Sequence, residues 1–373
     1  MNDCVEEKIS MTKCVNVTLS VLPDVSMTTS TKKEDLFFFE GVEKILEIYF
    51  ESKDGDKRDL REIRRDVWDK ILHAGKCAIL VKDSNSYCDT YILSESSLFV
   101  YPNKIIIKTC GKTTPLSCLP ILESHARKEH GLTIRGLGFH RKNYSFPKEQ
   151  IDCHRSFKDE VCAIRRLFPK FQDQSHVLGS LDSEHWVTHN AGVTMNDDDD
   201  VVMHLLCYDM EKNTSMFFKS EKNTAESVTR CLELEKMICG NDDENRGDDD
   251  VVIHAHMFEP CGYSMNGLNG SNYVTVHVTP ESHCSYASFE TNCTKTPHNV
   301  LMTEILRKLR PKRFTVVLHG NNTTMSSSDP TKLKDVIVDK IDHYARRSHD
   351  VAILSSSQSV CSVSHFSRTP PSC

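Results

Sequence analysis

The sequence lacks the features that would assign it to a membrane or to a nucleic acid. No stretch approaches the roughly 18 uninterrupted apolar residues of a membrane-spanning helix, and the first residues contain no apolar core of signal-peptide length. Basic residues are not in excess, because 46 lysines and arginines stand against 53 acidic residues, for a net charge of -7. A nucleic-acid-binding surface needs a basic excess. We therefore expect a cytoplasmic protein that binds neither membranes nor nucleic acid.

The sequence also lacks any Cys-x-x-Cys pair, although it contains 16 cysteines. This absence argues against a structural zinc site of the finger or ribbon type, which holds its metal with such pairs. Disulfide frameworks are typical of small secreted domains, whereas these cysteines are scattered through 373 residues without a secretion signal. We expect most of them to be free thiols.

Compositional bias marks both ends of the chain. Residues 1–34 are rich in Ser, Thr and Lys and show no sustained periodicity, which favours a disordered extension. Residues 357–373 are rich in Ser and Pro, and we expect a flexible tail there. The remaining residues, 35–356, are numerous enough to bury a substantial core, and we expect them to form one domain.

Hydrophobic periodicity predicts an α+β fold with many antiparallel strands. The apolar residues between Val42 and Tyr49 fall at positions i, i+3, i+4 and i+7, which predicts a helix over about 42–50. Closely spaced strands with tight polar turns follow it and are typical of an antiparallel meander. We expect further helices at 60–73, 114–129, 155–168, 225–238, 298–309 and 331–346, and strands at 36–39, 76–82, 87–93, 97–101, 104–109, 133–139, 176–181, 185–189, 201–208, 251–257, 272–279, 284–290, 313–319 and 351–355.

The second half of the chain echoes the first. Ser84–Tyr87 leads through a strand to the acidic turn Ser94–Ser96. Gly270–Tyr273 leads in the same way to Pro280–Ser282, and an aromatic-bearing strand follows each turn. This weak repeat predicts an internally duplicated fold.

The polar turn at Glu95-Ser96 is the centre of the functional interpretation. It lies in Tyr91–Val100, where apolar and β-branched residues flank Ser94-Glu95-Ser96-Ser97. Alone, this pattern predicts a strand, a turn and a second strand, and serines in such turns usually only bond to the backbone. Its significance comes from the other segments that accompany it.

Five segments occur together in an order and spacing that match a known family. They are Phe38–Lys44 (FFEGVEK), Tyr91–Ser97 (YILSESS), Lys108–Gly111 (KTCG), Phe258–Gly267 (FEPCGYSMNG), and His277–Glu281 (HVTPE) with Tyr286–Asn292 (YASFETN). Over about residues 36–355 the chain resembles the eukaryotic-type, pyruvoyl-dependent S-adenosylmethionine decarboxylases. This resemblance implies a four-layer αββα sandwich, in which two antiparallel sheets lie face to face with helices outside.

The resemblance implies that Ser96 is converted into the cofactor. Decarboxylation of an α-amino acid leaves a carbanion that needs an electron sink. In this family the sink is a pyruvoyl group, whose ketone forms a Schiff base with the substrate amine, without pyridoxal phosphate and without a metal. The Ser96 hydroxyl would attack the Glu95 carbonyl, and autocatalytic cleavage would leave the pyruvoyl group on the long C-terminal chain. The cleaved N-terminal chain would stay bound as a partner.

The family match assigns roles in processing and catalysis to five further residues. His277 would be the base in processing, since the unperturbed pKa of histidine lies near neutrality. Ser264, expected in a loop, would support the processing intermediate, and Glu43 would also act in processing. Cys110 would donate a proton to the product carbon, and Glu40 would be a carboxylate that aids catalysis.

The substrate would be S-adenosylmethionine, converted to the aminopropyl donor for spermidine and spermine. Phe39 and Phe258 match the rings that stack on either side of the adenine, and such rings also attract a sulfonium cation. Glu281 matches the ligand of the ribose hydroxyls. Leu93 and Glu95 match residues whose backbone flanks the adenine.

The match to the putrescine site of animal members is incomplete. Glu290 corresponds to one acidic residue of that site. The other acidic residues would come from about 190–205, where Asp198 or Asp200 could correspond to one of them while Val202 replaces a glutamate. Activation by putrescine is therefore left open, as is the formation of a homodimer.

Two other interpretations come from different classes of protein. A regulatory paralogue that activates a partner decarboxylase would be expected to lose Ser96, Cys110 or His277, and all three are present. A metal-dependent hydrolase or storage protein could use His254, His256 and the aspartate runs at 197–200 and 242–250. The two histidines would share one face of a strand, but no third ligand has a diagnostic spacing. Taken singly, the site histidine, serine and phenylalanines also have ordinary structural interpretations as strand, turn and core residues.

Overall fold

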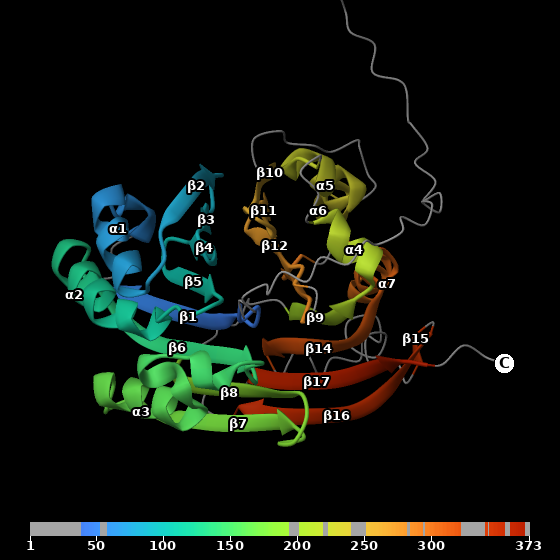
Figure 1. Cartoon of the computed structure of the whole chain (residues 1–373). Coiled ribbons are helices and arrows are strands. Elements are labelled where there is room, and N and C mark those ends of the chain that lie inside the picture. Colours follow the sequence, from blue (N-terminus) through green and yellow to red (C-terminus); the bar gives the residue numbers. More distant parts are fainter. Residues whose placement is uncertain are drawn as a thin grey trace, which may run out of the picture. The chain divides into compact units, whose positions relative to one another are not determined.

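Two antiparallel β-sheets form the centre of the fold (Figure 1). The computed structural model describes residues 39–52, 58–193, 201–218, 223–239, 251–281, 284–293, 295–321, 340–341, 343–354 and 359–369. Residues Phe38–Cys373 belong to one compact unit. The expected extension, residues 1–34, lies outside the described residues.

The first sheet has eight strands in the order β2-β3-β4-β5-β1-β6-β8-β7. They are β1 (Lys44–Ser52), β2 (Ile79–Ser84), β3 (Asp89–Leu93), β4 (Ser96–Val100), β5 (Lys104–Thr109), β6 (Leu132–Lys142), β7 (Asp173–Gly179) and β8 (His185–Gly192).

The second sheet has nine strands in the order β10-β11-β12-β13-β9-β14-β17-β16-β15. They are β9 (Val202–Met210), β10 (Val251–Met257), β11 (Tyr263–Asn269), β12 (Asn272–Thr279), β13 (Tyr286–Thr291), β14 (Pro311–Asn321), β15 (Lys340–Ile341), β16 (Tyr344–Leu354) and β17 (Ser359–Arg368).

The two sheets share one strand order. In each, the first strand in sequence (β1 or β9) pairs on one side with the last strand of a four-stranded meander, β2–β5 or β10–β13. On its other side it pairs with the next long strand, β6 or β14, which in turn pairs with the last strand of its half. The internal duplication that the sequence predicts is therefore confirmed in the topology of the fold.

Three hydrophobic clusters define four layers. Helices α1 (Arg65–Ala74), α2 (Leu119–Glu129) and α3 (Phe157–Leu167) pack Trp68, Leu122 and Ile164 into a cluster with the first sheet. A second cluster joins the second sheet to α5 (Ala225–Cys231), α6 (Leu234–Cys239) and α7 (His298–Leu309), near which lies the short α4 (Lys212–Phe217).

The third cluster lies between the sheets and includes Phe99 and Ile106 from one and Tyr273 and Val317 from the other. The predicted αββα sandwich is confirmed, with helices on the outer faces (Figure 1).

The helix predicted over 42–50 is wrong, because this segment is the central strand β1. β1 pairs with β5 on one side and β6 on the other, and its first seven residues are all buried. Leu46 faces the helices while Ile45 faces the second sheet. A strand covered on both faces is apolar at almost every position, so an apparent helical period arises within it.

The predicted flexible tail is also wrong in its first part. β17 lies between β14 and β16, and Ser359–Phe366 are buried there. The helix predicted at 331–346 is wrong where the structure describes it, since β15 and the start of β16 occupy that range. Small serines such as Ser362 and Ser364 fit a strand covered on both faces, and they conceal its hydrophobic alternation.

Most of the other predicted elements lie within a few residues of their expected positions. The meander at 76–109 and the helix at 298–309 are confirmed, while the helix at 225–238 is divided into α5 and α6. Strand β11 was not predicted. Among the described residues, no helix has both the length and the apolarity needed to cross a membrane.

Candidate active site

The Glu95-Ser96 bond lies at the tight turn between β3 and β4. Leu93 pairs with Ser96 across this hairpin, so Ser94 and Glu95 form the turn. The Ser94 amide donates to the Ala78 carbonyl at 2.8 Å, and the Ala78 amide donates to the Ser94 hydroxyl at 3.0 Å. The predicted strand-turn-strand is confirmed, and the neighbouring segment holds its turn in place.

Ser96 has an unusual backbone conformation. Its φ angle is 129°, in a region that L-amino acids rarely adopt. Leu98 and Val100 pack toward the helices, and strict alternation along β4 would direct Ser96 to the same side. Its hydroxyl instead contacts His277 of the opposite sheet. Backbone strain is thus located beside the bond that the sequence interpretation expects to break.

Two side chains contact the Ser96 hydroxyl. Its Oγ lies 3.1 Å from Oε1 of Glu43 and 3.0 Å from Nδ1 of His277. The Glu43 carboxylate and the His277 ring are themselves 3.3 Å apart, and all three residues are buried. The structure therefore brings together three residues predicted from separate segments of the sequence.

Asn266 on β11 organises the far side of the histidine. Its amide nitrogen donates to the Tyr91 carbonyl at 3.0 Å, so its amide oxygen faces the other way. That oxygen only accepts hydrogen bonds, and it receives them from Ser97 at 2.7 Å and Thr275 at 2.9 Å. Both hydroxyl protons are therefore used in bonds to Asn266.

This arrangement selects the tautomer of His277. The Ser97 and Thr275 oxygens lie 2.9 and 3.0 Å from Nε2 of the ring, and they accept its N–H because their own protons point to Asn266. Nδ1 is then the acceptor that faces the Ser96 hydroxyl. The imidazole is held in the form that can remove a proton from Ser96.

Buried charges surround this centre. Burial lowers the pKa of His277 to about 4, so the ring is neutral at neutral pH. Burial alone would raise the pKa of Glu43, but the Lys108 ammonium holds it below its usual value. The Lys108 ammonium lies 3.6 Å from Glu43 and forms a second ion pair with Glu290. The Glu43 carboxylate is therefore ionised beside a neutral base.

Cys110 contacts the carbonyl of the Glu95-Ser96 bond. Its backbone amide donates to the Glu95 carbonyl oxygen at 3.0 Å, and its Sγ lies 3.5 Å from the same atom. Burial raises the pKa of the Cys110 thiol well above its usual value, and the Glu95 carboxylate adds to this effect. The cysteine is a protonated thiol whose amide polarises the carbonyl.

The carboxylates of Glu95 and Glu40 lie near the same segment. Burial raises the pKa of Glu95 to about 7, although the Lys44 ammonium opposes this shift. Glu40 is buried, and its Oε2 accepts the Phe146 amide at 2.7 Å. The Glu40 carbonyl accepts the Gly111 amide at 2.8 Å, which ties the segment to the residue after Cys110.

Ser264 lies on β11 and not in the expected loop. It is the cross-strand partner of His277, with its side chain on the same face of the sheet. Among the described residues it forms no hydrogen bond with Ser96 or Glu95. The structure thus places Ser264 beside the proposed base without a direct contact to the bond.

The predicted substrate residues come from four separate segments of the chain. Gly111, with φ of 63°, leaves room for the Phe39 ring, since a Cβ there would lie 3.1 Å from it. Phe258 packs edge-on against His256, with ring centroids 4.8 Å apart. Leu93 ends β3, and Glu281 follows β12.

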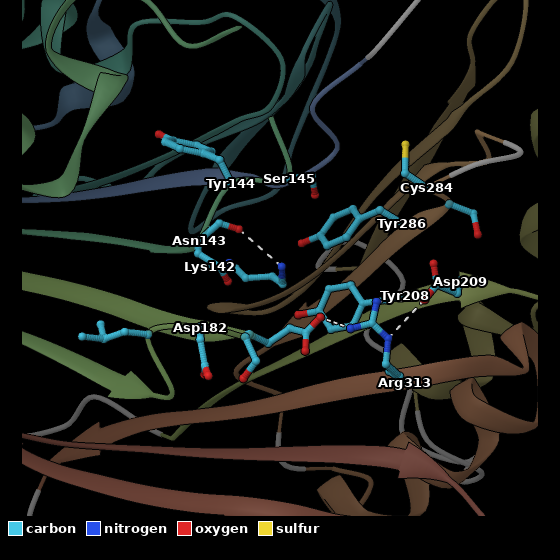
Figure 2. A pocket seen from close by; sticks show the side chains of 14 residues that line it. Lys142, Asn143, Tyr144, Ser145, Asp182, Tyr208, Asp209, Cys284, Tyr286 and Arg313 are labelled. Atoms are coloured by element: carbon cyan, nitrogen blue, oxygen red, sulfur yellow. Dashed lines mark hydrogen bonds and ion pairs between the residues drawn. The ribbon is translucent and has the colours of Figure 1, made fainter. Parts of the chain in front are cut away.

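A separate cavity of about 340 Å³ is lined in part by Tyr286 (Figure 2). Lys142, Tyr208 and Arg313 also line it, and Arg313 is ion-paired with Asp209 at 2.8 Å. The site residues predicted from the sequence do not line this cavity. Tyr286 connects it to the reaction centre, because its hydroxyl donates to Glu43 at 3.4 Å.

The region compared with the putrescine site contains a histidine. Asp198 and Asp200 lie outside the described residues, and Val202 begins β9. His204 on β9 lies 2.7 Å from Glu290, which also accepts the Tyr273 hydroxyl at 2.6 Å. The Glu290 carboxylate is thus already engaged by groups of this chain.

The cysteines and the histidines of β10 were considered above as possible disulfide and metal-binding residues. Every cysteine whose side chain is described is a free thiol, as expected. His254 and His256 both lie on β10, but within the described ranges no third ligand gathers with them.

Sequence interpretation missed Ser97, Thr275, Asn266 and Lys108 as parts of the centre. Asn266 follows Ser264 by two residues and Thr275 precedes His277 by two, so both pairs share a strand face. This period is a usable signal for Thr275, whereas the Gly-Tyr-Ser-Met sequence before Asn266 favours a loop and hides the same signal there.

Comparisons with known proteins point to one family. The model of the adenosylmethionine decarboxylase family matches residues 36–366. The chain is similar to the S-adenosylmethionine decarboxylase proenzyme of Drosophila melanogaster, with 34% identity over 305 residues that cover 78% of this chain and 84% of that protein. The proenzyme of Dictyostelium discoideum is 35% identical over 314 residues, covering 80% of this chain and 79% of that protein.

One solved structure supports the same relationship. The Trypanosoma brucei AdoMetDC-delta26 monomer aligns with a TM-score of 0.52 and 25% sequence identity. The alignment covers 73% of this chain and 99% of that one.

Proposed function

This chain belongs to the adenosylmethionine decarboxylase family, and from that premise we propose that it is a proenzyme that cuts itself between Glu95 and Ser96. Its family makes it a decarboxylase of polyamine biosynthesis. The observation that carries the proposal is the Ser96 hydroxyl, which lies between the Glu43 carboxylate and the acceptor nitrogen of His277.

The first step moves the Glu95 acyl group from nitrogen to oxygen. The Ser96 Oγ attacks the Glu95 carbonyl carbon while His277 Nδ1 accepts the hydroxyl proton. The Cys110 amide, 3.0 Å from the carbonyl oxygen, stabilises the negative charge that develops there. The C–N bond then breaks, the proton returns to the Ser96 nitrogen, and an ester joins the two residues.

The second step eliminates the ester. A base removes the Ser96 Cα proton, the Cα–Cβ bond becomes double, and the Glu95 carboxylate leaves as a new C-terminus. His277 is the base we assign to this step, because its free nitrogen lies beside Ser96. The dehydroalanine that remains takes up a proton at Cβ and becomes an imine. Water adds to the imine carbon, ammonia leaves, and the ketone of the pyruvoyl group is formed.

The fold suits a pyruvoyl group at position 96. That group would supply the electron sink for decarboxylation. β4 remains paired with β5 from Ser97 to Val100 whether or not residue 95 is attached, so the new end is held in place. β1 and β3 belong to the N-terminal fragment and are hydrogen-bonded within the same sheet, so that fragment stays bound.

During turnover, we assign Cys110 as the proton donor to the product carbon. Its thiol is protonated at neutral pH because burial raises its pKa. Glu40, whose backbone carbonyl binds the Gly111 amide, is the carboxylate that we assign to aid catalysis. This role needs the Cys110 side chain, whereas the cleavage step uses its backbone amide.

For substrate recognition, we assign S-adenosylmethionine to the edge of the inter-sheet space. Phe39 and Phe258 would stack on the adenine, and Glu281 would accept hydrogen bonds from the ribose hydroxyls. Leu93 and Glu95 would contribute backbone groups to the adenine. The position of the Phe39 ring against Gly111, next to Cys110, supports this assignment.

Intact mass and a denaturing gel of the purified chain test the proposal. We expect two fragments divided after Glu95, of which the long one has no free amino terminus, and release of labelled carbon dioxide from carboxyl-labelled substrate. Ser96→Ala should abolish both cleavage and activity, while Ser86→Ala, on the exposed β2–β3 turn, should leave both intact. A persistent single chain that releases no carbon dioxide would overturn the proposal.

A further inference from the structure

A second cluster of buried polar residues joins the two sheets. Glu47 on β1, His140 on β6 and His319 on β14 each offer one ligand atom, and these atoms all lie within 4.8 Å of one another. All three residues are buried. Glu47 lies on β1 and Glu43 directly precedes that strand, so about 13 Å of extended chain separates them.

We propose that Glu47, His140 and His319 bind one divalent transition-metal ion, Zn²⁺ by the type of ligand, that links the first sheet to the second. This site is separate from the Ser96 centre and does not depend on the proposed self-cleavage.

His140 has the hydrogen bonding of a metal ligand. Its Nδ1 lies 2.7 Å from the Thr188 hydroxyl, which fixes the orientation of the ring. Its Nε2 has no hydrogen-bond partner, although the residue is only 4% exposed. A metal-binding histidine usually has one ring nitrogen held by a hydrogen bond, while the other ring nitrogen is free to bind the metal.

Gly138 provides the space for this ring. It pairs with Glu47 on β1 and with Asn190 on β8, so the three residues form a row across the sheet. A Cβ on Gly138 would lie 2.5 Å from Nε2 of His140 and 3.0 Å from Oδ1 of Asn190. Asn190 is fully buried, and its side-chain amide has no hydrogen-bond partner. Its oxygen is therefore available as a fourth ligand.

Glu47 brings a negative charge into the same space. Its carboxylate accepts the Tyr49 hydroxyl at 2.7 Å. The charge of Lys104 acts on this carboxylate from a distance, but in the part of the chain that the structure describes no lysine or arginine forms a direct ion pair with it. An ionised carboxylate away from water is costly unless a cation is bound beside it. A metal ion between the sheets would provide that cation.

The chemistry of the ligands favours a transition-metal ion such as zinc over calcium or magnesium. Two imidazole nitrogens and one carboxylate oxygen are typical zinc ligands, and water or the Asn190 oxygen would occupy the fourth position. Calcium and magnesium prefer sites made of oxygen ligands. An organic dication such as putrescine is the alternative occupant, and it would need hydrogen-bond acceptors but no metal ligands. The experiment below distinguishes the two occupants.

The test measures the metal content of the full-length protein. After incubation with one equivalent of Zn²⁺ and gel filtration, elemental analysis should find one zinc per chain. Glu47→Gln and His140→Gln should each lose that zinc. The matched control is His189→Gln, a buried histidine of β8 whose side chain bonds to Ser175 outside the cluster, and it should keep the zinc.

Cobalt substitution distinguishes this site from zinc bound by the 16 cysteines. Co²⁺ at a nitrogen and oxygen site should show visible d–d bands without sulfur charge-transfer absorption. Thr188→Val, which keeps the ligands, should weaken binding by about 10- to 100-fold. Absence of zinc from the wild type, equal zinc in all variants, or a sulfur charge-transfer band would overturn the proposal. So would a thermal midpoint raised by putrescine and unchanged by zinc.

Discussion

The hydroxyl of Ser96 lies 3.0 Å from Nδ1 of His277, although the two residues are 181 positions apart and come from different sheets. The first sheet contributes the hydroxyl and the second contributes the nitrogen, so neither half of the duplicated fold contains a complete centre. The space between the sheets, and not a surface cleft, is where the reacting groups meet.

Replacing His277 should stop self-cleavage. His277→Asn removes the acceptor nitrogen, and loss of a general base typically slows a reaction by about 10²- to 10⁴-fold. A time course of freshly translated chain on denaturing gels measures the rate. His298→Asn, another buried histidine, is the control and should be cut normally. Normal cleavage of His277→Asn would remove this residue from the mechanism.

Replacing Asn266 should slow cleavage through the tautomer of His277. Asn266→Ala removes the oxygen that binds Ser97 and Thr275, so Nε2 no longer has a fixed role as donor. A lost buried hydrogen bond of about 1.4–2.8 kcal/mol corresponds to about 10- to 100-fold in rate.

The pH profile of cleavage distinguishes this positioning role from general destabilisation. The profile of Asn266→Ala should shift, because both tautomers become populated. Asn269→Ala, on the same strand but bonded to Ile238, should change neither the rate nor the profile. An unchanged profile for Asn266→Ala would contradict the assignment.

Replacing Cys110 should separate cleavage from turnover. Cys110→Ala keeps the backbone amide that contacts the Glu95 carbonyl, so the two fragments should still form. Release of the correctly protonated product should fall by about 10²-fold or more, since the thiol proton is gone. Cys153→Ala, outside the centre, should affect neither. Full turnover by Cys110→Ala would contradict its role as proton donor.

Replacing Gly111 should affect substrate binding. Gly111→Ala forces a Cβ to within 3.1 Å of the Phe39 ring and should raise KM while cleavage continues. Gly131→Ala is the matched control, because its φ of 64° is almost the same and no atom lies within 4 Å of its Cβ. Both variants should lose about 1 kcal/mol of stability from backbone strain. Equal KM values would refute the placement of Phe39.

Lowering the pH should destabilise the fold, and the effect should begin at pH values well above the pKa of the buried histidines. Burial lowers the pKa of His140 to about 3 and of His277, His298 and His365 to about 4, from 6.5. Between pH 6.5 and 4 the unfolded chain therefore binds more protons than the folded chain, and the free energy of unfolding falls as pH falls. Urea unfolding at pH 7, 6 and 5 measures it, and a constant value would contradict the burial of these rings as neutral groups.

Most strands could be predicted from the sequence, because tight turns and alternating residues leave a local pattern, whereas the four layers were implied only by the family resemblance. It failed at β1 and β17, which are covered on both faces and have no polar side to mark their period. The reacting residues were found by resemblance, segment by segment. The hydrogen bonds of Asn266 were not, because they depend on two strands that meet only in the folded sheet.

β17 makes residues 359–368 essential to the second sheet, although their Ser-rich composition resembles that of a flexible tail. β14 and β16 both pair with β17, and neither pairs directly with the other. A premature stop codon before residue 359 would remove the strand between them and leave two long unpaired edges. Such edges pair with other chains, so we expect late truncations to cause aggregation of the encoded protein, not a shortened active enzyme.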